Sequence, residues 1–87
     1  MSNVVIYTTP YCGYCRRAKQ LLEKKKVKYT EIDVEDNPAQ REEMVQKSGR
    51  MTVPQIFING KHIGGSDDLY ELERQGKLDR LLRENSK

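Results

Sequence analysis

The sequence predicts an α/β fold: one domain over residues 1–87, built on a four-stranded mixed sheet with helices on both faces, in the order βαβαββα. Three features predict it. Residues 3–34 show the patterns of a strand, a helix and a second strand in succession. An Asn-Gly dipeptide at residues 59–60 separates two apolar runs, which is typical of a β-hairpin. Leucines at helical spacing follow residue 68 and predict a helical end.

The first half is expected to be a βαβ unit. Residues 3–7 form a continuous apolar run, which is typical of a strand buried on both faces. Residues 13–26 predict a helix with an inward apolar stripe. Residues 27–34 alternate as a strand and place Ile32 and Val34 on one side. Two strands joined in this way run parallel with a right-handed crossover.

The second half begins with a helix over residues 38–48. Asn37 is a good N-cap, Pro38 suits the first helical position, and Gly49 ends the helix. The hairpin follows over residues 55–64, with its turn at the Asn-Gly dipeptide.

A glycine turn leads from the hairpin into the last helical part. Gly64 and Gly65 allow a close backbone approach, and Ser66 or Asp67 can cap the helix that follows. One or two helices are expected here, interrupted near Gly76.

The chain's two cysteines, Cys12 and Cys15, stand where the first strand hands over to the first helix. Free N–H groups and the helix dipole at that point favour a thiolate at Cys12. A thiolate is the attacking species in disulfide exchange. Cys15 lies almost one turn further on and is expected to be less exposed, as a resolving cysteine. Arg16 and Arg17 add positive charge beside the pair.

A cysteine pair can also serve purposes other than redox chemistry. A structural disulfide this short would constrain little of the chain. Half of a zinc site would need four ligands, and the chain adds only one histidine, His62, which is expected to be a partly exposed strand residue. Two ordinary core thiols are the third possibility. The position of the CxxC motif between strand and helix favours redox chemistry.

The net charge of +3 is unevenly distributed. Residues 1–28 carry seven Lys or Arg against one acidic residue, whereas residues 29–48 carry six acidic residues against two basic ones. The basic part surrounds the cysteines and suits an anionic thiol substrate. Nucleic-acid binding is the rival interpretation, but the lysine run 24–26 closes a helix, where cations favour the dipole. No nucleic-acid partner is therefore expected.

The beginning of the sequence lacks a basic segment followed by an apolar run, so no secretory signal is expected. No apolar run approaches the length of a membrane span. We expect a cytoplasmic protein that does not contact membranes, and we expect it to be a monomer.

A second stretch, Thr52-Val53-Pro54, is expected to meet the first. A proline at a strand entrance is a candidate for a cis peptide bond, and a trans proline that merely starts the strand is the alternative. The fold places this loop beside the cysteines, where the main chain of Val53 can pair with an extended peptide. The turn at residues 64–67 offers N–H groups to a carboxylate, and Asp67 offers its own carboxylate to an amino group. Together these features describe a site for a small zwitterionic thiol peptide, for which glutathione is the obvious candidate.

Three separated motifs resemble the glutaredoxin family, over nearly the whole chain: residues 12–15 (Cys-Gly-Tyr-Cys), 52–55 (Thr-Val-Pro-Gln) and 64–69 (Gly-Gly-Ser-Asp-Asp-Leu). The chain looks like a small bacterial-type dithiol glutaredoxin. The resemblance implies a thioredoxin-like fold and glutathione-dependent reduction of protein–glutathione mixed disulfides and protein disulfides. Cys12 would attack the glutathionyl sulfur of a mixed disulfide and become glutathionylated itself, and a second glutathione would then release it. With protein disulfides, Cys15 would resolve the intermediate.

The resemblance also implies which residues bind glutathione. Tyr14 would flank it, Val53 would pair with its backbone, and the start of the helix after the glycine turn would hold its γ-glutamyl end. The implied set is Tyr14, Thr52, Val53, Pro54, Gly65, Ser66 and Asp67. The family often has a lysine where this chain has Thr9, and Arg16 or Arg41 would take its place.

Gly13 replaces the family's common proline and opens an alternative function. Some glutaredoxins without that proline hold a [2Fe–2S] cluster between two monomers, each of which would here supply Cys12, with two glutathiones as the other ligands. Such a protein would carry clusters or sense redox state. Cys15 favours the enzyme, for which no metal is expected. A thioredoxin is a further rival, but thioredoxins have tryptophan at the position of Tyr11, and this chain has no tryptophan.

Overall fold

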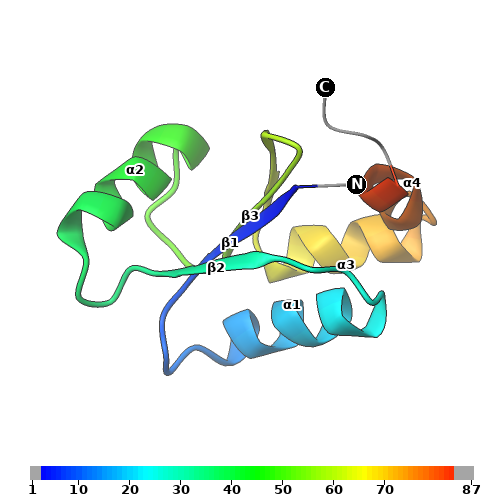
Figure 1. Ribbon diagram of the computed structural model, residues 1–87, viewed down its shortest axis with the longest axis horizontal. Coiled ribbons are helices and arrows are strands. Elements are labelled where there is room, and N and C mark those ends of the chain that lie inside the picture. The colour runs from blue at the N-terminus through cyan, green and yellow to red at the C-terminus, as the bar shows by residue number, and fades with distance from the viewer. Residues whose placement is uncertain (1–2, 84–87) are drawn as a thin grey trace.

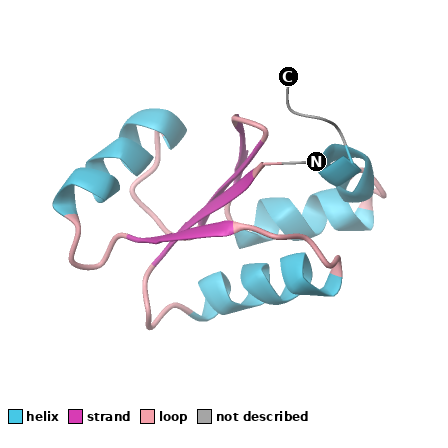
Figure 2. Cartoon of the chain, in the orientation of Figure 1, coloured by secondary structure: helices cyan, strands magenta, loops and turns pink. Residues whose placement is uncertain are grey.

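A computed structural model describes residues 3–83. Its strands are β1 (Val4–Thr8), β2 (Thr30–Asp33), β3 (Gln55–Ile58) and β4 (Lys61–Gly64). Its helices are α1 (Gly13–Lys24), α2 (Pro38–Ser48), α3 (Ser66–Arg74) and α4 (Leu78–Arg83). Figure 2 shows the strands as a layer between the helices. Within the described residues, no helix has the length and apolar character needed to cross a membrane.

The four strands form one mixed sheet in the order β2-β1-β3-β4. β1 and β2 are parallel, whereas β1 pairs with β3, and β3 with β4, in antiparallel fashion. The hairpin turn has φ of 54° at Asn59 and 81° at Gly60. Both angles are positive, as the two-residue turn requires, and the predicted hairpin is confirmed.

Helices cover both faces of the sheet, as the sequence predicts (Figure 1). Successive side chains of β1 alternate between the faces. Ile6 points into a core that it shares with α1, α3 and α4. Tyr7 points to the opposite face, where it shares a smaller core with Met44 of α2. Figure 1 shows α2 on one side of the strands and α1 and α3 on the other.

The helix α1 is shorter than predicted, because it ends at Lys24 rather than Lys26. Lys26 adopts a positive φ of 60°. The amide of Lys26 donates to Glu23 O over 2.9 Å, and that of Val27 donates to Leu22 O over 3.2 Å. These two bonds are the Schellman pattern that terminates a helix. The reversal delays the next strand, which begins at Thr30 rather than at residue 27.

The cap of α3 also differs from the prediction. Its N-cap is Gly65 rather than Ser66 or Asp67. The side chain that secures the helix start is that of Asp68, whose Oδ2 accepts the Gly65 N–H over 2.9 Å. Asp68 reaches back from the third helical position, where a carboxylate favours the positive end of the helix dipole.

At the start of α2, Asn37 occupies the N-cap position but makes no side-chain capping bond. Its Nδ2 instead donates to Asp33 O over 2.8 Å, which ties the loop to the end of β2. Gly49 ends α2 with φ of 73°, as predicted.

Candidate active site

Cys12 is the N-cap of α1, in an extended conformation with φ of −104° and ψ of 114°. Its Sγ accepts a hydrogen bond from the Cys15 N–H over 3.2 Å. The sulfur is therefore held by one of the amides that a helix start leaves without an intrahelical partner. Both cysteines are free thiols, and Cys12 is half-buried.

Cys15 lies inside the protein, with only 1% of its surface exposed. Burial, together with the hydrogen bond to Cys12, raises the pKa of its thiol to about 12. Cys15 is thus a protonated thiol at neutral pH. The expected difference in exposure between the two cysteines is confirmed.

The second predicted stretch does lie beside the cysteines. The Val53–Pro54 peptide bond is cis. The Val53 carbonyl oxygen lies 3.8 Å from Cys12 Sγ, within reach of a thiol donor. Residues 41 positions apart in the chain therefore meet at the reactive sulfur.

A cleft of about 210 Å³ extends from this contact toward the start of α3. At Gly65 the start of α3 lies close to the proline loop, since a Cβ placed there would lie 3.4 Å from Pro54 O. Three segments of the chain line the cleft, namely Tyr14, the loop residues Arg50, Thr52, Val53 and Pro54, and the helix start Gly65, Ser66, Asp67 and Asp68.

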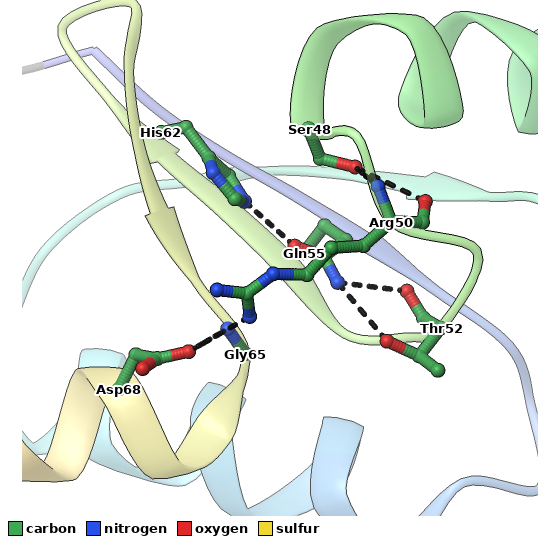
Figure 3. A network of polar contacts seen from close by, with 7 residues as sticks. All are labelled: Ser48, Arg50, Thr52, Gln55, His62, Gly65 and Asp68. Carbon is green, nitrogen blue, oxygen red and sulfur yellow. Dashed lines mark hydrogen bonds and ion pairs between the residues drawn. The ribbon is translucent and has the colours of Figure 1, made fainter.

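The completely buried side chain of Gln55 holds the loop that contains Val53. Gln55 Nε2 donates to Thr52 O over 3.0 Å and to Thr52 Oγ1 over 3.2 Å (Figure 3). Gln55 Oε1 accepts from His62 Nε2 over 2.7 Å, so that nitrogen carries a proton. Burial lowers the pKa of His62, and the charge of Arg50 lowers it as well. The amide of Gln55 thereby joins Thr52 to the neighbouring strand β4.

The same loop is held from the side by Arg50. The Arg50 main-chain N–H donates to Ser48 Oγ over 3.0 Å, and that hydroxyl donates to Arg50 O over 3.1 Å. Its guanidinium Nη1 donates to Asp68 Oδ2 over 3.0 Å (Figure 3). The hydrogen bond from the Gly65 N–H lowers the pKa of Asp68, and Arg50 contributes in the same direction.

Seven of the eight residues predicted to bind glutathione line this cleft. The eighth, Arg41, belongs to the first turn of α2 and is not among the lining residues, so its role stays a prediction. Arg16 is exposed beside the cysteines.

Sequence reasoning missed the roles of Arg50, Gln55, His62 and Asp68. Gln55 and Asp68 fall inside the motifs at residues 52–55 and 64–69, but nothing in their spacing reveals their partners. Arg50 stands in an exposed loop between elements, where no periodicity marks it.

The glutaredoxin family model matches residues 4–63, which is more than half of the chain. The chain belongs to the glutaredoxin family. Escherichia coli glutaredoxin 3 is 57% identical over 83 residues, covering 95% of this chain and 100% of that protein. A buckwheat glutaredoxin solved in complex with glutathione superposes with a TM-score of 0.86 at 38% identity, covering 93% of this chain and 76% of that one.

A second solved structure, described as "Metal Binding of Glutaredoxins", superposes with a TM-score of 0.74 at 55% identity and covers 100% of this chain and 94% of that one. These matches confirm the thioredoxin-like fold and the bacterial-type glutaredoxin predicted from the motifs. The chain is a thiol–disulfide oxidoreductase with a redox-active cysteine pair, and the family's activity depends on glutathione.

Proposed function

We propose that the protein reduces mixed disulfides between proteins and glutathione, and also protein disulfides, with Cys12 as the attacking thiolate. The observation that carries the proposal is the contrast between the two cysteines. Cys12 is half-buried at a helix start and accepts an N–H, whereas Cys15 is 1% exposed and has its pKa raised to about 12. Only Cys12 is positioned to meet a substrate disulfide.

With a glutathionylated protein, the Cys12 thiolate attacks the glutathionyl sulfur. The new S–S bond joins Cys12 to glutathione, and the protein leaves as a thiolate that takes up a proton. A second glutathione thiolate then attacks the same glutathionyl sulfur. This step forms glutathione disulfide and returns Cys12 as a thiolate, so that two electrons pass from glutathione to the protein substrate.

With a protein disulfide, Cys12 becomes joined to one substrate sulfur. Cys15 loses its proton and attacks Cys12 Sγ, which releases the reduced substrate and leaves a Cys12–Cys15 disulfide. Two glutathiones reduce that disulfide. The Cys15 amide already lies 3.2 Å from Cys12 Sγ, which supports a short path for the second cysteine.

Glutathione itself is assigned to the cleft. Val53 pairs with its main chain, Tyr14 flanks it with a side chain that is 58% exposed, and the α3 start receives its γ-glutamyl end at Ser66 and Asp67. The buckwheat relative, which was solved with glutathione, supports glutathione as the ligand. The glycine carboxylate is assigned to Arg16 or Arg41.

The test is glutathione-dependent reduction of a glutathionylated peptide by the wild type, Cys12→Ser and Cys15→Ser. Cys12→Ser is expected to abolish turnover, because serine supplies no thiolate. Cys15→Ser is expected to retain most of it, because the monothiol cycle does not use Cys15. Substantial turnover by Cys12→Ser would contradict the assignment of the attacking residue.

A second candidate function is supported by the relative described for metal binding. Among residues 3–83, no group of three or more His, Cys, Asp or Glu side chains could hold a metal ion. In this candidate each chain supplies Cys12, and a [2Fe–2S] cluster would need a second copy and the thiols of two glutathiones. Gly13 leaves room beside Cys12, since a Cβ there would meet nothing within 4 Å.

Reconstitution with iron, sulfide and glutathione separates the two candidates. We expect a colourless monomer, in keeping with a cytoplasmic reductase that glutathione keeps reduced. A visible absorption band that appears together with a dimer would instead favour cluster binding.

A further inference from the structure

Arg50 is a cation at the cleft to which the sequence assigns no role. Its main chain is fixed by two hydrogen bonds with Ser48, over 3.0 and 3.1 Å. Its side chain crosses from the end of α2 to the start of α3, where Nη1 bonds Asp68 over 3.0 Å (Figure 3). The guanidinium is thus held in place before any ligand arrives, which reduces the entropy lost on binding.

Most of the donors on that guanidinium have no partner among the residues that the structure describes. Arginine carries five N–H donors in a planar fork that matches a carboxylate. Within residues 3–83, the Arg50 guanidinium has one hydrogen-bond partner, Asp68. The Arg50 side chain is 49% exposed, so the remaining donors are accessible to a ligand.

The charges around Arg50 match the free end of an α-amino acid. Such an end carries a carboxylate and an ammonium on the same carbon. Among the described residues that line the cleft, Arg50 is the only Lys or Arg; it contacts Asp68, and Asp67 lines the same cleft. The amides of the first turn of α3 lie beside it and add partial positive charge. Arg41 and the position of the missing lysine, Thr9, do not line this cleft.

We propose that Arg50, held by Asp68, binds the α-carboxylate at the γ-glutamyl end of glutathione and makes the enzyme selective for that carboxylate. The proposal rests on the proposed use of glutathione. It adds a recognition residue to the site and leaves the reactions of Cys12 unchanged.

The test compares three thiols as reductants: glutathione, its analogue with γ-aminobutyrate in place of the γ-glutamyl group, and its glycine amide. Charge-assisted hydrogen bonds predict that the wild type prefers glutathione to the first analogue by roughly tenfold or more in kcat/KM. Arg50→Gln is expected to remove most of that preference. The ratio of kcat/KM for glutathione to that for its glycine amide is expected to be the same in Arg50→Gln as in the wild type. Arg50→Lys keeps the charge without the fork and is expected to be intermediate.

Arg74→Gln is the matched control, because Arg74 pairs with Glu71 on α3, and neither residue lines the cleft. It is expected to behave as the wild type with all three thiols. An equal loss with all three thiols in Arg50→Gln would show that Arg50 only supports the loop. If Arg50→Gln instead loses only the preference for glutathione over the glycine amide, Arg50 binds the glycine carboxylate. Either result overturns the proposal.

The same experiment separates this proposal from the one on which it rests. A wild type without glutathione-dependent turnover would overturn both. If the wild type is active with glutathione and Arg50→Gln shows the same preference for the α-carboxylate, only the role of Arg50 is overturned.

Discussion

The two loops that meet at Cys12 Sγ are built in opposite ways. The cysteine loop is open: Tyr11 is 94% exposed, and Cys12 Sγ is held by a single backbone N–H. The opposing loop is tied down on two sides, by Gln55 beneath Thr52 and by Arg50 through Asp68. One side of the site is accessible and the other is fixed.

The difference follows from what each side must do. A sulfur that forms and breaks bonds with large substrates needs access along the line of attack. A main chain that pairs with a peptide must hold its geometry before the ligand arrives, because ordering it afterwards would weaken binding. In the proposed function, the exposed loop carries the reacting sulfur and the fixed loop binds glutathione.

Among variants that keep Cys12, the largest effect is expected from the buried cysteine. Cys15→Ser removes the intramolecular resolving thiol, and we expect reduction of a protein disulfide to fall by roughly a hundredfold, since an external thiol lacks the proximity advantage. Reduction of a glutathionylated peptide by the same variant is the control and should be largely retained. Equal loss on both substrates would show that Cys15 supports Cys12 in both cycles.

The next largest effect is expected at Gly64, which lies against the Asp68 side chain that holds Arg50. A Cβ at Gly64 would lie 2.2 Å from Asp68 Oδ2, and its φ of 123° suits only glycine. Gly64→Ala should lower the free energy of unfolding by about 3 kcal/mol and weaken glutathione binding, because it displaces the carboxylate that holds Gly65 and Arg50.

Gly49→Ala is the matched control for that substitution. Gly49 has φ of 73°, but a Cβ there would meet nothing within 4 Å. Chemical denaturation should show a loss of about 1 kcal/mol from the backbone conformation alone, with normal glutathione binding. Equal losses in the two variants would exclude a role for the collision with Asp68.

A smaller effect is expected from the buried amide. Gln55→Leu leaves His62 Nε2 without its acceptor and releases Thr52, at a cost of about 2 kcal/mol in stability. The exposed Gln46→Leu on α2 should change stability by less than about 0.5 kcal/mol. Denaturant unfolding of both variants measures the difference, and similar values would mean that the Gln55 network does not stabilise the loop.

The smallest effect is a pH dependence at Asp68, whose pKa is lowered by the Gly65 N–H and by Arg50. Its folded-state pKa lies below its unfolded value, so the ionised carboxylate stabilises the fold above the unfolded pKa of about 3.9. That contribution is lost as the pH falls through the lower folded value. The stability difference between the wild type and Asp68→Asn should therefore be constant near neutrality and shrink below about pH 4. A difference that persists unchanged to pH 2 would contradict this assignment.

Several features of the fold and the site were determined by the sequence alone, because they depend on neighbours in the chain. The Asn59-Gly60 turn demands positive φ at both residues, and the hairpin formed as predicted. Cys12 stands between a predicted strand and a predicted helix, and it is the N-cap of that helix. The peptide bond before Pro54 is different: the sequence left cis and trans both open, because X-Pro bonds favour trans locally, and only the folded structure has it cis.

Only the tertiary structure decided how the loop that contains Val53 is held. Arg50 and Asp68 are 18 residues apart and pair only because the folded chain brings the loop after α2 to the start of α3. Gln55 finds His62 across the hairpin through the register of β3 and β4, which includes a bulge that the sequence does not mark. Side-chain partners of this kind depend on where distant backbones come to lie, so local pattern reveals the residues but not their contacts.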